Sequence, residues 1–172
     1  MDYAAARPLI RSGDVIGVMS RKGPLAWITR AVMRISGGRP YTHTGIALLQ
    51  AGRLYLVELN GGGNHLVPLS QITQPFDVAR PLANVSAEDV QIAVDFELEE
   101  HVGYGTASLI LIGLRRLFGA APRVPWGLVC SGYVMSILRR LGWAPEGLHP
   151  MPAPDEIMRA AGSVVISVNH IQ

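Results

Sequence analysis

The sequence has little charge and a single cysteine. Only 16% of its 172 residues are charged, and the formal net charge is +2. That excess is too small to predict nucleic-acid binding. One cysteine, Cys130, excludes an internal disulfide and any metal site built from several thiolates. If this residue has a chemical role, it acts as a thiol.

A long hydrophobic run is also missing. A membrane-spanning helix needs about 20 consecutive apolar residues, and the best candidate, 107–114, ends at Arg115 and Arg116. The sequence therefore predicts no transmembrane segment. The first residues carry Asp2 and no continuous apolar stretch, which is unlike a secretory signal. We expect a cytoplasmic protein as synthesised.

What is present is an apolar chain of ordinary domain size. Hydrophobic residues make up 49% of the sequence, and a chain of this length can bury a core without a disulfide or metal. No internal repeat or linker divides it. We therefore expect one domain over residues 1–172.

Hydrophobic periodicity predicts strands followed by helices. This order indicates the α+β class, with a small antiparallel sheet packed against helices. The predicted strands cover 14–19, 43–49, 54–59, 65–69 and 76–80, and the predicted helices cover 24–35, 87–100, 106–118 and 130–141.

The second and third predicted strands form a hairpin whose register can be worked out. An even-numbered loop between them places His43 opposite Asn60, and Gly45 opposite Glu58. Because strand side chains alternate between faces, all four then share one face and Glu58 can reach the imidazole. An odd-numbered loop would place Glu58 on the other face. A lone histidine at a strand start is otherwise more often a structural polar group.

Cys130 lies just before an apolar helical pattern. Backbone N–H groups and the helix dipole at a helix start favour a thiolate over a thiol. The alternative is a small buried side chain, which is common for free cysteine. The pattern consists of Val134, Ile137, Leu138 and Leu141.

Together, these three residues supply the parts of a nucleophilic site. Cys130 can attack an acyl carbon as a thiolate, His43 can hold and return the proton, and Glu58 can orient the imidazole. Their order along the chain is no obstacle, because such sites are defined by geometry.

Four segments carry a family resemblance. The segments 12–16 (SGDVI), 42–47 (THTGIA), 57–58 (VE) and 129–134 (VCSGYV) resemble the circularly permuted papain-like branch of the NlpC cell-wall peptidase superfamily, and YiiX-type proteins in particular. In that branch the order is histidine, glutamate, cysteine. The resemblance extends from Gly13 to 154–156, and it implies that His43, Glu58 and Cys130 are the catalytic residues.

Four further residues are predicted substrate contacts: Arg39, Tyr41, Asn60 and Tyr104. Arg39 can pair with a carboxylate, and Tyr104 can line the pocket or donate to an oxyanion, although a packing tyrosine is more common. The chain departs from the family at Gly132, where an acidic residue often follows the cysteine–serine pair.

The resemblance implies a cysteine amidase or endopeptidase, a thiol protease active in cell-wall degradation. We expect a peptidoglycan peptide as substrate, no cofactor, and delivery by phage tail or secretion-machinery proteins to the periplasm. Cys130 with His43 and His65 matches no zinc spacing. Two alternatives stay open: a lipid acyl hydrolase or acyltransferase on the same fold, and a non-enzymatic virion or assembly protein.

Overall fold

The structure is a computed structural model that describes residues 1–19, 41–60, 63–99, 130–149 and 152–169. These residues form a six-stranded sheet in the order β4-β3-β2-β1-β5-β6, with every neighbouring pair antiparallel. The predicted α+β class is confirmed. The strands are β1 (Val15–Met19), β2 (Tyr41–Gln50), β3 (Arg53–Asn60), β4 (Gly63–Pro68), β5 (Phe76–Ala79) and β6 (Val164–Val168), and the α-helices are α1 (Tyr3–Ala6), α3 (Ala87–Glu99), α5 (Cys130–Arg140) and α6 (Pro154–Ala160).

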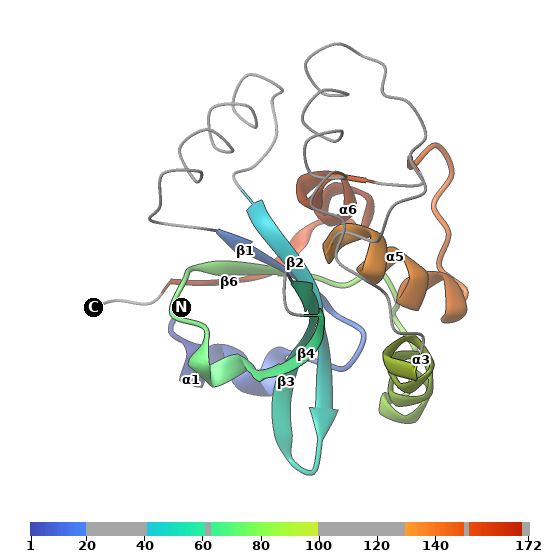
Figure 1. The fold of residues 1–172 in the computed structure, drawn as a ribbon. Helices are drawn as coiled ribbons and strands as arrows, with labels where there is room; N and C mark the ends of the chain where they lie inside the picture. The colour runs from blue at the N-terminus through green and yellow to red at the C-terminus, as the bar shows by residue number, and fades with distance from the viewer. Residues whose placement is uncertain (20–40, 61–62, 100–129, 150–151, 170–172) are drawn as a thin grey trace.

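The sheet separates two hydrophobic clusters. Because side chains alternate along a strand, Ile46 and Val57 point to one face and Ala47 and Leu56 to the other. The first face packs against α3, α5 and α6, and the second against α1 and the short 3-10 turns Arg7–Leu9 and Leu69–Gln71. Figure 1 shows the three longer helices on one side of the sheet and α1 on the other.

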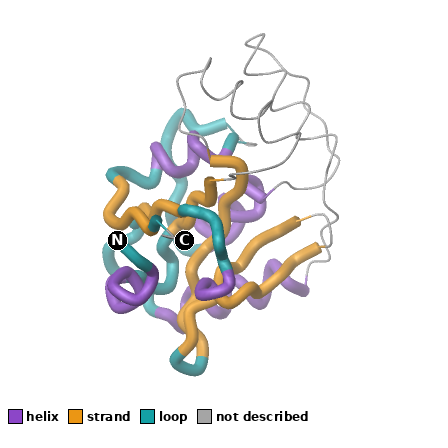
Figure 2. Tube along the Cα trace, turned by 90° about the vertical axis from the view of Figure 1, so that its left-hand side faces the viewer, coloured by secondary structure: helices purple, strands orange, loops and turns teal. Residues whose placement is uncertain are grey.

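The β2–β3 hairpin confirms the predicted register. Its ladder runs from the pair Ile46 and Val57 to the pair Gln50 and Arg53, which leaves a two-residue loop. The loop residues Ala51 and Gly52 have φ of 48° and 75°, as a type I′ turn requires. The hairpin tip projects from one end of the molecule (Figures 1 and 2).

Two predictions about the fold were wrong or incomplete. Strands are not confined to the first half of the chain, because β6 pairs with β5 from the far end, and α1 precedes every strand. The sequence analysis missed β6, α1 and α6, which are each seven residues or shorter and give little periodicity. Strand β2 also includes Tyr41 and Thr42, which precede the predicted start at residue 43. The predicted helices over 24–35 and 106–118 lie outside the described residues.

Both ends of the described chain meet at the outer strand. The N-terminal ammonium of Met1 donates to the Ser167 carbonyl at 3.0 Å, and the Asn169 N–H donates to the Met1 carbonyl at 3.0 Å. These bonds bring the first residues beside β6. The reactive candidates lie elsewhere, where α5 meets β2.

Candidate active site

Cys130 lies in α5, on the helical pattern that its apolar spacing predicted, and the residues before it lie outside the described residues. The apolar face of this helix packs on the sheet, and its last turn carries Arg139 and Arg140, which suit a helix C-terminus. Ser131 Oγ donates to the Pro152 carbonyl at 2.5 Å, which ties the start of α5 to the segment before α6. Cys130 is 2% exposed, so its sulfur lies in an enclosed position.

His43 and Glu58 meet at the end of the hairpin where the β2–β3 ladder has stopped. The last recorded pair is Ile46 with Val57, so the predicted pairs beyond it are not part of the ladder. His43 Nε2 nevertheless lies 2.7 Å from Glu58 Oε2. The prediction that the carboxylate can reach the imidazole is therefore confirmed as geometry.

Gly45 lies between the paired part of the β2–β3 hairpin and the part that holds His43 and Glu58. The structure shows why this position is occupied by glycine. A Cβ placed there would lie 2.5 Å from Leu56 Cδ1 and 2.6 Å from the Val57 carbonyl oxygen. The second contact is with backbone, which cannot move aside without shifting β3. A glycine is therefore needed for β2 and β3 to approach this closely next to His43.

Asn60 contacts the carboxylate. Its Nδ2 donates to Glu58 Oε1 at 3.0 Å, while Oε2 faces His43. The two oxygens are thus fixed from opposite sides, which holds the carboxylate plane. The sequence analysis named Asn60 as a substrate contact, whereas this bond gives it a role in positioning Glu58.

The Cys130 thiol is hydrogen-bonded to the His43 side chain. Since Nε2 of the ring faces Glu58, Nδ1 is the nitrogen left for the sulfur. The backbone N–H groups of Thr44 and Ser131 also donate to the sulfur. These three groups favour the Cys130 thiolate, and two of them, His43 and Thr44, come from β2 rather than from α5.

The three titratable groups shift one another toward their charged forms. Burial alone would lower the pKa of His43, but hydrogen bonds and charge from Cys130 and Glu58 raise that pKa to about 10. Burial opposes the charged form of Cys130 as well, yet its bonds with His43, Thr44 and Ser131 lower the pKa of the thiol. The pKa of Glu58 is lowered by His43 and Asn60 against the effect of burial. The arrangement favours a thiolate–imidazolium pair backed by a carboxylate.

His65 lies directly opposite Glu58 in the β3–β4 ladder. Its charge, when protonated, favours the Glu58 carboxylate. Among the described residues, no group of three or more histidine, cysteine, aspartate or glutamate side chains is arranged to hold a metal ion.

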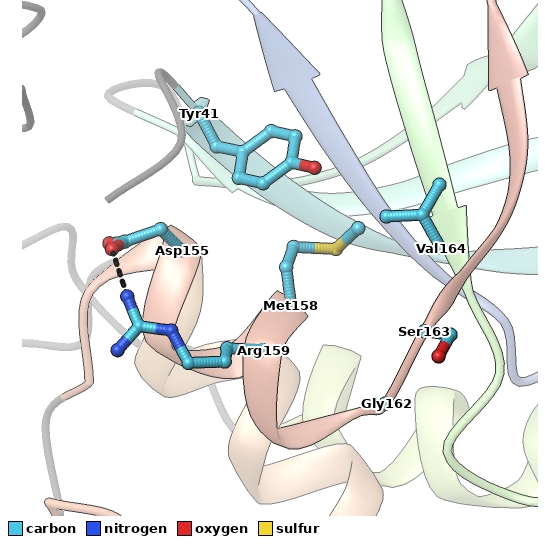
Figure 3. A pocket seen from close by; sticks show the side chains of 7 residues that line it. All are labelled: Tyr41, Asp155, Met158, Arg159, Gly162, Ser163 and Val164. Carbon is cyan, nitrogen blue, oxygen red and sulfur yellow. Dashed lines mark hydrogen bonds and ion pairs between the residues drawn. The ribbon is translucent and has the colours of Figure 1, made fainter. Parts of the chain in front are cut away.

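Tyr41 is part of the core. It is 1% exposed, and its hydroxyl donates to Asp77 Oδ2 at 2.5 Å. Its ring borders a pocket of about 230 Å³ between α6 and β6, where Met158 and the Asp155–Arg159 ion pair also lie (Figure 3). This burial gives Tyr41 a packing role, and only the ring surface in the pocket is open to a ligand. Arg39 and Tyr104, the other predicted contacts, lie outside the described residues.

Sequence reasoning missed Thr44. It was noticed only as part of the segment around His43, and no residue pattern shows that its N–H will point at a sulfur 86 positions away. The signal available was its position beside the candidate histidine.

No helix in the described parts of the chain has the length and apolarity to cross a membrane.

The chain is similar to a solved structure, while no family model or curated protein matches it. Among solved structures, it is similar to the crystal structure of metalloprotein yiiX from Escherichia coli O157:H7, DUF1105. The identity is 15%, the match covers 93% of this chain and 97% of that one, and the TM-score is 0.48. The family suggested by the sequence motifs stays a prediction.

Proposed function

We propose that the chain is a cysteine hydrolase with a permuted papain-like fold, in which Cys130 is the nucleophile, His43 the base and Glu58 the orienter. The observation that carries this proposal is the 2.7 Å contact between His43 Nε2 and Glu58 Oε2, together with the interaction of the same imidazole with the Cys130 thiol that lowers the pKa of that thiol. Each group favours the charged form of its neighbour. A merely structural cysteine does not need such an arrangement.

The proposed reaction proceeds in two stages. The Cys130 thiolate attacks the carbonyl carbon of an amide, a C–S bond forms, and the carbonyl electron pair moves to oxygen. As the pair returns, the C–N bond breaks and His43 gives its proton to the leaving amine. Water, deprotonated by His43, then attacks the thioester and releases an acid and the free thiol. Glu58 stabilises the imidazolium and fixes the ring throughout.

The proposed substrate is a peptide or amide bond in peptidoglycan. This choice is supported by the motif resemblance around His43, Glu58 and Cys130. The resemblance also accounts for the order of these residues along the chain. Delivery by phage tail or secretion-machinery proteins would bring the protein to that substrate. The lipid acyl alternative uses the same thiolate, so a substrate comparison separates the two.

The first experiment measures alkylation of Cys130 by iodoacetamide as a function of pH. With one cysteine in the chain, every alkylated molecule reports this site. The parent protein should react well below the free-thiol pKa of about 8.5, and His43→Ala should react only near or above it, since burial then acts without the imidazole. His149→Ala, which changes a histidine outside the site, should behave like the parent.

The second experiment tests the acyl substrate. Purified peptidoglycan, a phospholipid and a simple thioester are each incubated with the parent protein and with Cys130→Ala. Release of new amino groups from peptidoglycan by the parent alone supports the amidase proposal, and release of fatty acid alone supports the lipid alternative.

The alkylation experiment decides whether the hydrolase proposal stands. If His43→Ala and the parent show the same alkylation profile, the nucleophile–base pair is absent and the hydrolase proposal fails.

A further inference from the structure

The Thr44 hydroxyl is buried with no hydrogen-bond partner. Thr44 is 0% exposed, and its Oγ1 is one of four buried side-chain polar atoms without a partner in the described structure. Leaving a buried hydroxyl unpaired is unfavourable, because it loses water and gains nothing in return. A valine has the same shape and would avoid this loss. The hydroxyl therefore calls for a partner that the described residues do not supply.

The backbone geometry directs the N–H of Thr44, the residue that carries this hydroxyl, toward the reactive sulfur. The Ala47 N–H donates to Asp14 on the β1 side, and strand alternation then points the Thr44 N–H toward β3. The β2–β3 ladder has already ended there, so this N–H donates to the Cys130 sulfur instead. The Thr44 amide is available to the sulfur because the β2–β3 pairing ends at Ile46 and Val57.

The side chain of Thr44 points to the same layer as Cys130. Thr44 pairs with Gly17 on β1, and the side-chain direction of Gly17 meets Met158 of α6. Residues paired across a ladder share a face, so the Thr44 hydroxyl lies on the face covered by α5 and α6. Because the N–H of the same residue interacts with the sulfur, a carbonyl that Cys130 attacks enters next to Thr44.

The other three unpartnered atoms have different surroundings. Tyr133 lies near Glu97, whose charge adds to burial in raising the pKa of the phenol, and the remaining two atoms belong to Asn64 and His65 on β4. None of these three residues has a backbone group recorded as bonded to the Cys130 sulfur, and Thr44 has one. Before a substrate binds, only the backbone N–H of Thr44 stabilises the Cys130 thiolate, and its hydroxyl takes no part.

We infer that Thr44 is a catalytic residue whose hydroxyl donates a hydrogen bond to the oxyanion formed when Cys130 attacks a carbonyl. This inference rests on the proposed hydrolase function. The C–S bond forms, the carbonyl electron pair moves to oxygen, and the Thr44 Oγ1–H satisfies that charge without giving up its proton. A donor that is unpaired in the ground state and paired in the transition state lowers the barrier, because the interaction exists only where it accelerates the reaction.

The test compares two reactions of the same thiolate. Iodoacetamide alkylates the sulfur by displacing iodide and forms no oxyanion, whereas p-nitrophenyl acetate acylates it through a tetrahedral oxyanion and releases p-nitrophenolate. The rates of both reactions are measured for the parent, Thr44→Val and Thr44→Ser, with Cys130→Ala subtracted as background. The ratio of acylation to alkylation isolates the oxyanion step from changes in thiolate content.

We expect the ratio to fall about 100-fold in Thr44→Val and to stay within about threefold of the parent in Thr44→Ser, whose hydroxyl remains. Thr44→Val should also melt at or above the parent temperature, because it removes an unpaired buried hydroxyl. If Thr44→Val does not fold, Thr44→Ala against Thr44→Ser gives the same contrast.

Two results would overturn the inference and are distinguishable. A Thr44→Val ratio equal to that of the parent, with a clear acylation burst in both, shows that the hydroxyl is not an oxyanion donor while the hydrolase proposal stands. A parent protein that alkylates readily but shows no acylation above Cys130→Ala refutes the hydrolase function itself, and the Thr44 inference falls with it.

Discussion

The β2–β3 hairpin has two ends of opposite character. At its closed end, residues 46–50 and 53–57 form an uninterrupted ladder joined by a tight turn. At its open end, residues 43–45 and 58–60 leave that ladder and hold His43 and Glu58 instead. The same two strands thus supply stability where backbone groups pair with each other, and a candidate site where they do not. An interrupted ladder frees a backbone amide for another partner, here the Cys130 sulfur.

The largest expected effect comes from the closed end. Leu56→Ala removes a side chain that is 0% exposed in the cluster facing α1, and we expect a loss of about 2–5 kcal/mol in the free energy of unfolding. Urea denaturation gives this value. The alkylation profile of Cys130 should hold its pH midpoint at temperatures where the variant stays folded.

The matched control on the same hairpin is Leu49→Ala. Leu49 is 44% exposed, so its truncation should change the free energy of unfolding by less than about 0.5 kcal/mol. If the two variants were equally stable, the closed end would not be the source of stability that the comparison requires.

The boundary between the two ends is tested by Gly45→Ala. The added Cβ would meet Leu56 Cδ1 at 2.5 Å and the Val57 carbonyl at 2.6 Å, so β2 and β3 must move apart at a cost of about 1–3 kcal/mol. Because His43 lies two residues away on the same strand, a shift of β2 should also weaken its hydrogen bond to Glu58. We expect a lower melting temperature together with a higher pH midpoint for Cys130 alkylation. A variant with parent values for both would show that the strands do not approach this closely.

The open end is tested by Glu58→Gln, which keeps an oxygen acceptor for His43 but removes the negative charge. The ion pair exists from the lowered pKa of Cys130 up to the pKa of His43 at about 10. Without the carboxylate charge, the pKa of His43 falls and that of Cys130 rises, so the window narrows from both sides. A change of one pKa unit corresponds to about tenfold in the stability of the pair.

Activity or acylation measured against pH checks this prediction. The basic limb should move to lower pH and the acidic limb to higher pH in Glu58→Gln. Glu88→Gln, in the first turn of α3 and away from the site, should leave both limbs in place. A basic limb that stays where it is in Glu58→Gln would mean that Glu58 does not support the imidazolium.

The two ends also differ in how far the sequence predicted them. The closed end could be predicted because Ala51-Gly52 is the kind of short loop that fixes register by counting residues, and the helix that contains Cys130 followed from apolar spacing. The open end could be predicted only as a reachable distance between His43 and Glu58. Neither the end of the ladder nor the bond from the Thr44 amide to the sulfur could be predicted, because both depend on where α5 packs. The role of Asn60 toward Glu58 was missed although both residues lie on β3, two positions apart and on one predicted face.

The smallest expected effect is at the hairpin tip, where the turn geometry sets the register of both ends. Ala51 has a φ of 48°, which is unfavourable for a residue with a Cβ by about 1–2 kcal/mol, whereas asparagine tolerates this region and precedes glycine in many type I′ turns. Ala51→Asn should therefore stabilise the protein by about 0.5–1 kcal/mol, a rise of about 1–4 °C in melting temperature. Gly52→Ala should destabilise the protein, because alanine is strained at the φ of 75° found there. Nothing lies within 4 Å of the added methyl, so backbone strain is the whole effect. If the two substitutions change the melting temperature in opposite directions and leave the alkylation profile unchanged, the turn contributes stability and register alone. A change in the same direction would contradict the type I′ assignment.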